Sequence, residues 1–231
     1  MSIQKKIDSF LRVNDSKDEP LCLICLQKER QLPSRFLLEE DVCVCRECQK
    51  KFILHKKSYL IDQVYYHVLF EYDEWAQRLL FQYKDQRDIV LRRVFLSSQE
   101  KRFFEKMKKY TLVGLCSSEK KRQERGFEPL LEIFSEYALF VFSPFYKQEE
   151  IKQSSLSKQE RARIQKILKI KEGYWMPKKK RMLVDDVLTT GNSVQAALSL
   201  IPMKEVFVLF AHPLWIESHQ KDVKKHDSFF I

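Results

Sequence analysis

The run MLVDDVLTTGNS at residues 182 to 193 constrains the fold of this chain more than any other feature. Its apolar first half predicts a strand that delivers two adjacent carboxylates, Asp185 and Asp186, to its end, and the polar loop that follows leads into a helix. A strand, a short loop and a helix in this order are typical of α/β proteins, which bind ligands at the carboxyl ends of parallel strands. We therefore expect a ligand site at this loop.

The residue types in the loop suit a phosphorylated sugar. Gly191 can adopt backbone angles closed to other residues, so the main chain can approach a ligand closely. Backbone N–H groups at a helix start suit a phosphate monoester, and carboxylates can accept hydrogen bonds from ribose hydroxyls and help to hold Mg²⁺. The alternative interpretation is an acidic turn before an ordinary helix. The candidate phosphate-binding residues are Asp185, Asp186, Thr189, Thr190, Gly191, Asn192 and Ser193.

Strand-like and helix-like runs alternate along the second half of the chain. We expect strands at 64–72, 111–116, 181–184 and 204–210, and helices at 74–83, at 128–137, from Ser157 and after residue 193. This alternation predicts an α/β fold, with a mostly parallel sheet that carries helices on both faces. The expected domains are a polar leader at 1–19, a four-cysteine zinc module at 20–60 and the α/β domain at 61–231.

Two Cys-x-x-Cys pairs lie near the N-terminus, Cys22 with Cys25 and Cys45 with Cys48, separated by 19 residues. This spacing is typical of a structural zinc site, because two tight turns can aim four thiolates at one ion. Cys43 is an alternative to Cys45 as a ligand, and buried cysteines without a metal are the other interpretation. The opening MSIQKKIDSF lacks the apolar core of a signal peptide, and no run of 18 apolar residues predicts a membrane helix. We therefore expect a cytoplasmic protein, in which reduced cysteines bind metal.

The net charge of +10 is unevenly distributed. Residues 84 to 125 contain 13 Lys or Arg against 6 Asp or Glu, an excess of +7. A block of this density predicts contact with a nucleic-acid backbone, and the alternative is a solvated basic surface. Within it, Lys84, Arg122 and Arg125 are candidates for contact with pyrophosphate or DNA.

Taken together with these motifs, three further segments give the chain a family resemblance. They are LFEYDEWAQRLLFQYKDQRD (69 to 88), GLCSSEKKRQERGF (114 to 127) and QSSLSKQERAR (153 to 163). Their order and spacing resemble the ComF (ComFC) late-competence family, over roughly residues 20 to 212. That resemblance implies a zinc ribbon ahead of a type I phosphoribosyltransferase-like domain.

The resemblance also implies function. Asp185 and Asp186 would face the ribose of 5-phosphoribosyl-1-pyrophosphate (PRPP), with Mg²⁺, and residues 189–193 would bind its 5′-phosphate. The implied partners are single-stranded DNA and a ComFA-type helicase ATPase, at the inner face of the membrane, in DNA uptake. The alternative is an active phosphoribosyltransferase with an unidentified acceptor base, and we assign no catalytic residue.

The sequence departs from the family pattern on the pyrophosphate side. The family's pyrophosphate loop usually carries prolines, where this chain has LVGLCSS, and Asn-Gln usually follows ERGF, where this chain has Glu128 and Pro129. Arg87 stands where glycine is common, and Ile164 where asparagine is common. Because the 5′-phosphate loop is intact, we expect binding of a ribose 5-phosphate group rather than transfer.

Overall fold

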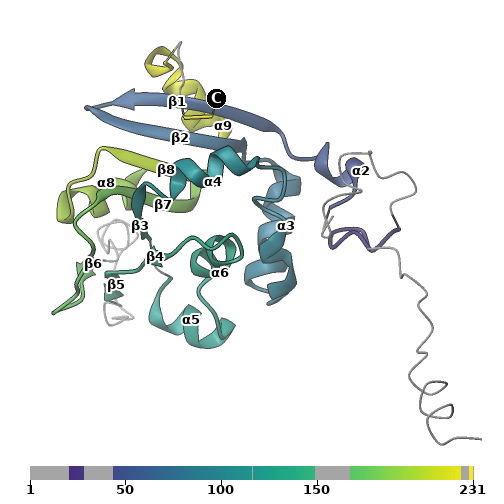
Figure 1. Ribbon diagram of the computed structural model, residues 1–231, viewed down its shortest axis with the longest axis horizontal. Coiled ribbons are helices and arrows are strands. Elements are labelled where there is room, and N and C mark those ends of the chain that lie inside the picture. The colour runs from purple at the N-terminus through teal and green to yellow at the C-terminus, as the bar shows by residue number, and fades with distance from the viewer. Residues whose placement is uncertain (1–20, 29–43, 116, 149–166, 225–228, 231) are drawn as a thin grey trace, which may run out of the picture. The chain divides into compact units, whose positions relative to one another are not determined.

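The structure is a computed structural model of the 231-residue chain (Figure 1). It describes residues 21–28, 44–115, 117–148, 167–224 and 229–230. The chain divides into two compact units, Met1–Gln49 and Lys50–Ile231. The predicted leader, Cys43, Cys116, the helix expected from Ser157 and the 153–163 segment lie outside the described residues.

The second unit is built on a six-stranded sheet in the order β1-β2-β8-β7-β3-β4. All neighbouring strands run parallel except β1 and β2, so the predicted mostly parallel α/β sheet is confirmed. The strands of this sheet are β1 (Leu54–Ile61), β2 (Val64–Glu71), β3 (Tyr110–Gly114), β4 (Val141–Phe142), β7 (Lys180–Leu188) and β8 (Glu205–Ala211). A separate antiparallel pair consists of β5 (Phe145–Gln148) and β6 (Ile167–Ile170).

Helical segments connect these strands. They are α3 (Glu74–Lys84), η2 (Ile89–Arg93), α4 (Lys101–Met107), α5 (Glu119–Arg125), α6 (Pro129–Ser135), α8 (Asn192–Leu200), α9 (Pro213–Ser218) and η3 (Gln220–Asp222). Short polar caps fix two of them: Asp73 accepts a hydrogen bond from the N–H of Ala76 at the start of α3, and Ser118 accepts one from Lys121 at the start of α5.

The two faces of the sheet pack against different helices, because successive residues of a strand point in opposite directions. On one face, Val206 and Val208 of β8 belong to the buried cluster that includes Val194 of α8 and Trp215 of α9. On the other face, Phe207 contacts Phe103 of α4 and Phe134 of α6, with ring centroids 5.5 and 6.2 Å apart. Helices therefore cover both faces, as the alternating pattern predicts.

Strand β1 belongs to the second unit. It pairs with β2 from Ile61↔Val64 to Leu54↔Phe70, around the two-residue turn at Asp62 and Gln63. The division between the units therefore falls before β1, and not after residue 60, where the sequence placed it.

The connections lead toward opposite edges of the sheet from β3 and from β7, which are parallel neighbours inside it. From β3 the chain crosses to β4 on one side, and from β7 it crosses through α8 to β8 on the other side. Loops diverge at such a point and leave a crevice at the carboxyl ends of the strands. The topology thus places the predicted ligand site at the end of β3 and β7.

Candidate functional site

A cavity of about 180 Å³ occupies this crevice. Its lining consists of cations, carboxylates and hydroxyls, with Leu115 as the one apolar side chain. The cations are Lys84, Lys121, Arg125 and Lys147, the carboxylates are Glu128, Asp185 and Asp186, and the hydroxyls are Ser117, Ser118 and Ser193. Such a mixture suits a small, strongly polar ligand that carries both phosphate and hydroxyl groups.

The two adjacent carboxylates come from β7 itself. The strand continues past them to Leu188, which pairs with Ala211 of β8, so they lie inside the strand and not after its end. Asp185 accepts a hydrogen bond from the N–H of Asp186 at 2.9 Å. Burial, reinforced by the charge of Asp186, raises the pKa of Asp185 to about 7. A nearby cation or hydroxyl donor would therefore stabilise the ionised form of Asp185.

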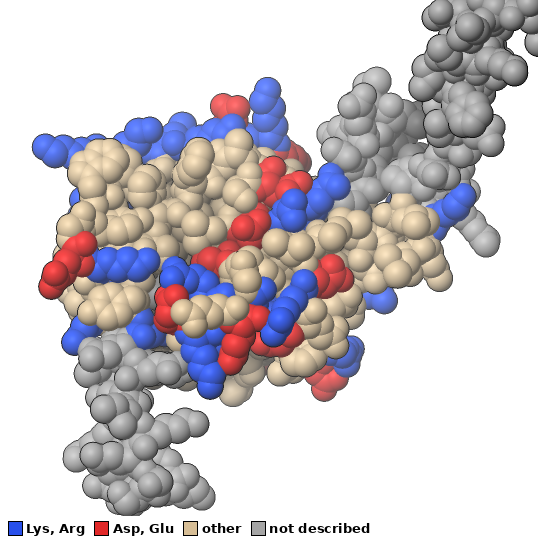
Figure 2. All heavy atoms as spheres, turned by 90° about the horizontal axis from the view of Figure 1, so that it is seen from below, with Lys and Arg blue, Asp and Glu red and all other residues tan. Residues whose placement is uncertain are grey.

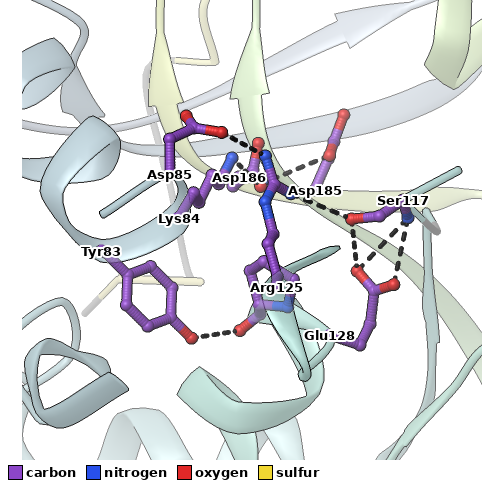
Figure 3. A network of polar contacts seen from close by, with 9 residues as sticks. Tyr83, Lys84, Asp85, Ser117, Arg125, Glu128, Asp185 and Asp186 are labelled. Atoms are coloured by element: carbon purple, nitrogen blue, oxygen red, sulfur yellow. Dashed lines mark hydrogen bonds and ion pairs between the residues drawn. The ribbon is translucent and has the colours of Figure 1, made fainter. Parts of the chain in front are cut away.

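Lys84 supplies one such cation. It is the last residue of α3, and its ammonium group forms an ion pair with Asp186 (Figure 3). Both side chains are less than one fifth exposed, so the attraction is screened less than at an open surface. The pair joins the end of α3 to β7 across the cavity.

The loop after β7 opens α8 in the way the sequence predicts. Gly191 has a φ of 81°, in the left-handed region, and immediately precedes the first residue of α8. Gly191 offers no capping side chain, so the amide groups of the first turn remain donors for a ligand. Ser193 lines the cavity, and Thr189, Thr190 and Asn192 are exposed at its edge of the sheet.

The opposite wall contains a contact that the sequence did not predict. Glu128 accepts hydrogen bonds from the backbone N–H of Ser117, at 3.2 and 3.3 Å, and from its hydroxyl at 3.0 Å (Figure 3). Burial raises the pKa of Glu128, although its bonds from Ser117 act in the opposite direction. The Glu128 carboxylate thus already accepts from the Ser117 amide in the loop after β3, so that amide is not free to bind an anion.

Arg125 connects this wall to α3. Its guanidinium donates to Asp85 at 3.0 Å and to the hydroxyl of Ser117 at 3.3 Å. Its side chain is only 10% exposed, whereas the Arg122 guanidinium is much more exposed and pairs with Glu119 on the surface of α5. The structure therefore brings Lys84 and Arg125 into the cavity with Asp185, and it leaves Arg122 outside the lining.

Several cations of the 84–125 block are neutralised within the fold. On the face that carries α5, acidic and basic side chains lie intermingled (Figure 2). The pairs include Lys84–Asp186, Arg125–Asp85, Arg92–Glu136 and Lys120–Glu124. The excess of +7 in the sequence therefore overstates the positive charge that this block presents to a ligand.

Four cysteines of the first unit form a second candidate site. The Sγ atoms of Cys22, Cys25, Cys45 and Cys48 all lie within 4.8 Å of one another, and those of Cys25 and Cys45 are 3.7 Å apart. Thiolates about 2.3 Å from one ion, at the corners of a tetrahedron, lie about 3.8 Å from each other. The four cysteines could therefore hold a metal ion such as zinc.

The local backbone explains why these cysteines converge. Cys22 begins a tight turn in which the N–H of Leu26 donates to its carbonyl at 2.8 Å, and Cys45 immediately precedes the short helix α2 (Arg46–Gln49), with Cys48 inside it. The N–H of Cys48 donates to the Sγ of Cys45 at 3.4 Å. Such amide bonds favour the thiolate form, which is the form that binds metal.

No protein-family model matches this chain, and no curated protein matches it either. None of the helices in the described segments combines the length and apolarity that a membrane crossing requires.

Proposed function

We propose that this chain is a ComF-type competence protein, which binds single-stranded DNA during uptake and carries a site for a phosphoribosyl group of the PRPP type. The observation that carries the proposal is the cavity at the ends of β3 and β7. It combines the carboxylates of β7, the glycine-led start of α8 and two partly buried cations, Lys84 and Arg125. The family resemblance supplies the link to competence and to the type I phosphoribosyltransferase-like fold.

The ribose 5-phosphate group fits this cavity by chemistry. The amides at the start of α8 and the hydroxyl of Ser193 would hold the phosphate, because a helix start concentrates free N–H donors. Asp185 and Asp186 would accept hydrogen bonds from the ribose hydroxyls and hold Mg²⁺, which proteins often bind through one or two carboxylates and the phosphates of a substrate. Mg²⁺ would neutralise charge on the bound phosphates.

Binding is better supported than transfer because of the opposite wall. Transfer from PRPP releases pyrophosphate, so the protein must hold a second, highly charged group during the reaction. In this chain, Glu128 places a carboxylate on the amide of Ser117, in the loop that would receive that group by the family resemblance. The repulsion opposes pyrophosphate and leaves the phosphate at α8 unaffected.

The four-cysteine unit would hold one structural zinc ion, because four thiolates leave no open position for a substrate. We propose this unit as the docking surface for a ComFA-type helicase ATPase, at the inner face of the membrane. A pull-down of the helicase with zinc-loaded protein tests this: the wild type should retain the helicase, and a Cys25→Ser variant should not. Equal retention by both would refute docking through this unit.

The main test is fluorescence anisotropy of labelled single strands, with 5′-phosphate or 5′-hydroxyl ends, titrated with zinc-loaded protein over a salt series. We expect binding that weakens with salt, with a slope of about −0.7 per phosphate contacted. Thr190→Ala should weaken the 5′-phosphorylated strand more than the 5′-hydroxyl strand, if the loop accepts a terminal phosphate. No binding of either strand at modest salt would refute the DNA-handling role.

A second candidate function is an active Mg²⁺-dependent phosphoribosyltransferase. The observation that favours it is the pair Asp185 and Asp186 with Lys84 across the cavity, which can position a ribosyl centre and stabilise its charge. Pyrophosphate release from PRPP, measured with each nucleobase in turn, would establish this activity. Release with none of them, alongside measurable PRPP binding, would leave the binding function.

A further inference from the structure

A second, larger hollow of about 580 Å³ lies at the opposite end of the sheet. It is lined by the β1–β2 turn at residues 62–64, by residues 179–181 where β7 begins, and by residues 202–205 between α8 and β8. These segments surround the amino ends of parallel strands, whereas the phosphoribosyl cavity lies at their carboxyl ends. The two sites are separated by most of the length of β7, roughly 20 Å at about 3.3 Å per residue.

Positive charge dominates this hollow. Four cations, Lys179, Lys180, Arg181 and Lys204, face two acids, Asp62 and Glu205. Glu205 is already engaged by the His67 ring at 2.7 Å, which reduces its effect on a ligand. Within the described part of the chain, none of the four cations forms an ion pair, whereas Lys84, Arg92, Lys120 and Arg125 of the 84–125 block each do.

One residue that lines the hollow also has a buried polar atom without a partner in the described part of the chain. The Nε of Arg181 is buried without a hydrogen bond, although Arg181 lines the hollow. Its register partner on β3, Thr111, is 3% exposed and has a buried hydroxyl that also lacks a partner.

We infer that this hollow binds the phosphate backbone of single-stranded nucleic acid, an inference that rests on the proposed DNA-handling function. Its cations match phosphodiester oxygens, which accept hydrogen bonds and carry one charge each. Tyr65, which is 39% exposed and is paired on β2 with the lining residue Glu205 of β8, offers a ring on which a base can stack. Stacking on the Tyr65 ring requires an unpaired base, which a single strand offers and a duplex does not.

This placement assigns the two ends of the sheet to two ligands. Nucleic acid contacts the amino ends through unpaired cations, and the phosphoribosyl group binds at the carboxyl ends. Because most of β7 separates them, one ligand does not exclude the other by contact. The cations that the sequence marked for DNA, in the 84–125 block, instead stabilise the phosphoribosyl cavity and the surface of α5.

The test compares two double variants of the full, zinc-loaded chain. Lys180→Gln with Lys204→Gln removes two cations of the hollow, and both side chains are exposed, so the fold should tolerate the change. Lys101→Gln with Arg102→Gln is the matched control, because these two exposed cations do not line the hollow. They lie at the start of α4, and the other end of that helix, about 10 Å away, is the end that leads to β3. Thermal melting checks that both variants are folded.

The readout is anisotropy of a labelled single strand with a 5′-hydroxyl end, so that the loop at α8 is not tested. Loss of two phosphate contacts should lower the salt slope by about 1.4 and the affinity by about 25-fold at 0.1 M salt. The control variant should keep the wild-type slope, and a duplex of equal length should compete poorly.

Each other outcome has a distinct meaning. If the wild type binds the strand and the hollow variant binds it equally well, the DNA contact lies elsewhere and this inference is wrong, whereas the proposed function stands. If both variants lose the same affinity, or the duplex competes as well as the strand, the contact is a general charge effect, and the hollow is again refuted. If the wild type binds no single strand, the proposed function itself fails.

Discussion

Replacing Glu128 by glutamine should strengthen pyrophosphate binding, because it removes a negative charge from the wall where that ligand would lie. The amide side chain of the Glu128→Gln variant would keep an oxygen that accepts from the N–H of Ser117, so the local structure should persist. The charge has no cation bonded to it among the described contacts, and burial already raises the pKa of Glu128, which shows that its ionised form is disfavoured. The substitution therefore changes charge with little change in shape.

The size of the effect follows from the cavity. A sphere of about 180 Å³ has a radius of about 3.5 Å, so an anion at its centre lies roughly 6 Å from a lining carboxylate. At an effective dielectric constant of about 20, that separation gives a repulsion of about 3 kcal/mol per charge. Lys121, Arg125 and salt screen part of it. We expect a net gain of about 1–2 kcal/mol, or about 5- to 30-fold in affinity.

The assay is isothermal titration of pyrophosphate with Mg²⁺ into the wild type, Glu128→Gln and the control Glu124→Gln, at pH 8 and at pH 6. Glu124 is an exposed acid on α5, about 4.0 Å from Lys120, and lies outside the cavity lining, so its variant should bind within about twofold of the wild type. Because burial raises the pKa of Glu128, acidification protonates more of it than of an ordinary glutamate, and the advantage of Glu128→Gln should be smaller at pH 6 than at pH 8. Equal affinity of the wild type and Glu128→Gln at pH 8 would refute the reasoning.

Three further predictions concern stability. The pKa of Asp185 rises from 3.8 to about 7 on folding, so its ionisation costs stability as pH rises between those values, by up to about 4 kcal/mol. Between pH 5 and pH 8 the melting temperature of Asp185→Asn should therefore fall less than that of the wild type. Melting temperatures that fall equally with pH in both proteins would argue against the raised pKa of Asp185. Gly191→Ala should cost about 1 kcal/mol in denaturant unfolding, because an added Cβ meets only ordinary contacts at 3.8 Å and the penalty comes from φ of 81°. Chelation should release about one zinc per chain, measured by elemental analysis, and unfold Met1–Gln49 while the melting of Lys50–Ile231 is unchanged; release of no metal from fully folded protein would exclude the zinc site.

Local patterns in the sequence predict those elements of this fold that bury an uninterrupted run of apolar residues. Strands β7 and β8 are such runs, and helix α8 follows from Gly191 and the spacing of Val194 and Ala197. The four cysteines were predictable for another reason: two tight turns determine the direction of the ligands without the rest of the chain. In both cases neighbours in the sequence are neighbours in space.

Strand β1 was not predicted because its own sequence lacks a regular strand pattern. LHKKSYLI carries two lysines, Lys56 has a φ of 44°, and the register with β2 shifts between Leu54 and Lys57. This irregularity breaks the two-residue alternation by which a strand is identified. The pairing with β2, and not the local pattern, makes this segment a strand.

Charge pairing was even less predictable, and for the same reason. Lys84 and Asp186 are about a hundred residues apart in the chain, and only the meeting of α3 with β7 brings them together. Sequence charge counts treat Lys84 as part of a basic surface, whereas the fold uses it to neutralise a carboxylate. A block of cations can be read as a binding surface only after its internal partners are known.

The pairing of cations also determines which end of the sheet each proposed ligand can use. A cation that compensates a buried acid is unavailable to DNA, because removing it would leave an uncompensated carboxylate in the cavity. Within the described residues, Lys84 and Arg125 are paired with carboxylates at the cavity, whereas no ion pair engages residues 179–181 or Lys204. If nucleic acid were to bind at the carboxyl ends instead, it would have to break the Lys84–Asp186 and Arg125–Asp85 pairs. Contact at the amino ends requires no such loss, which is why the hollow is the favoured surface.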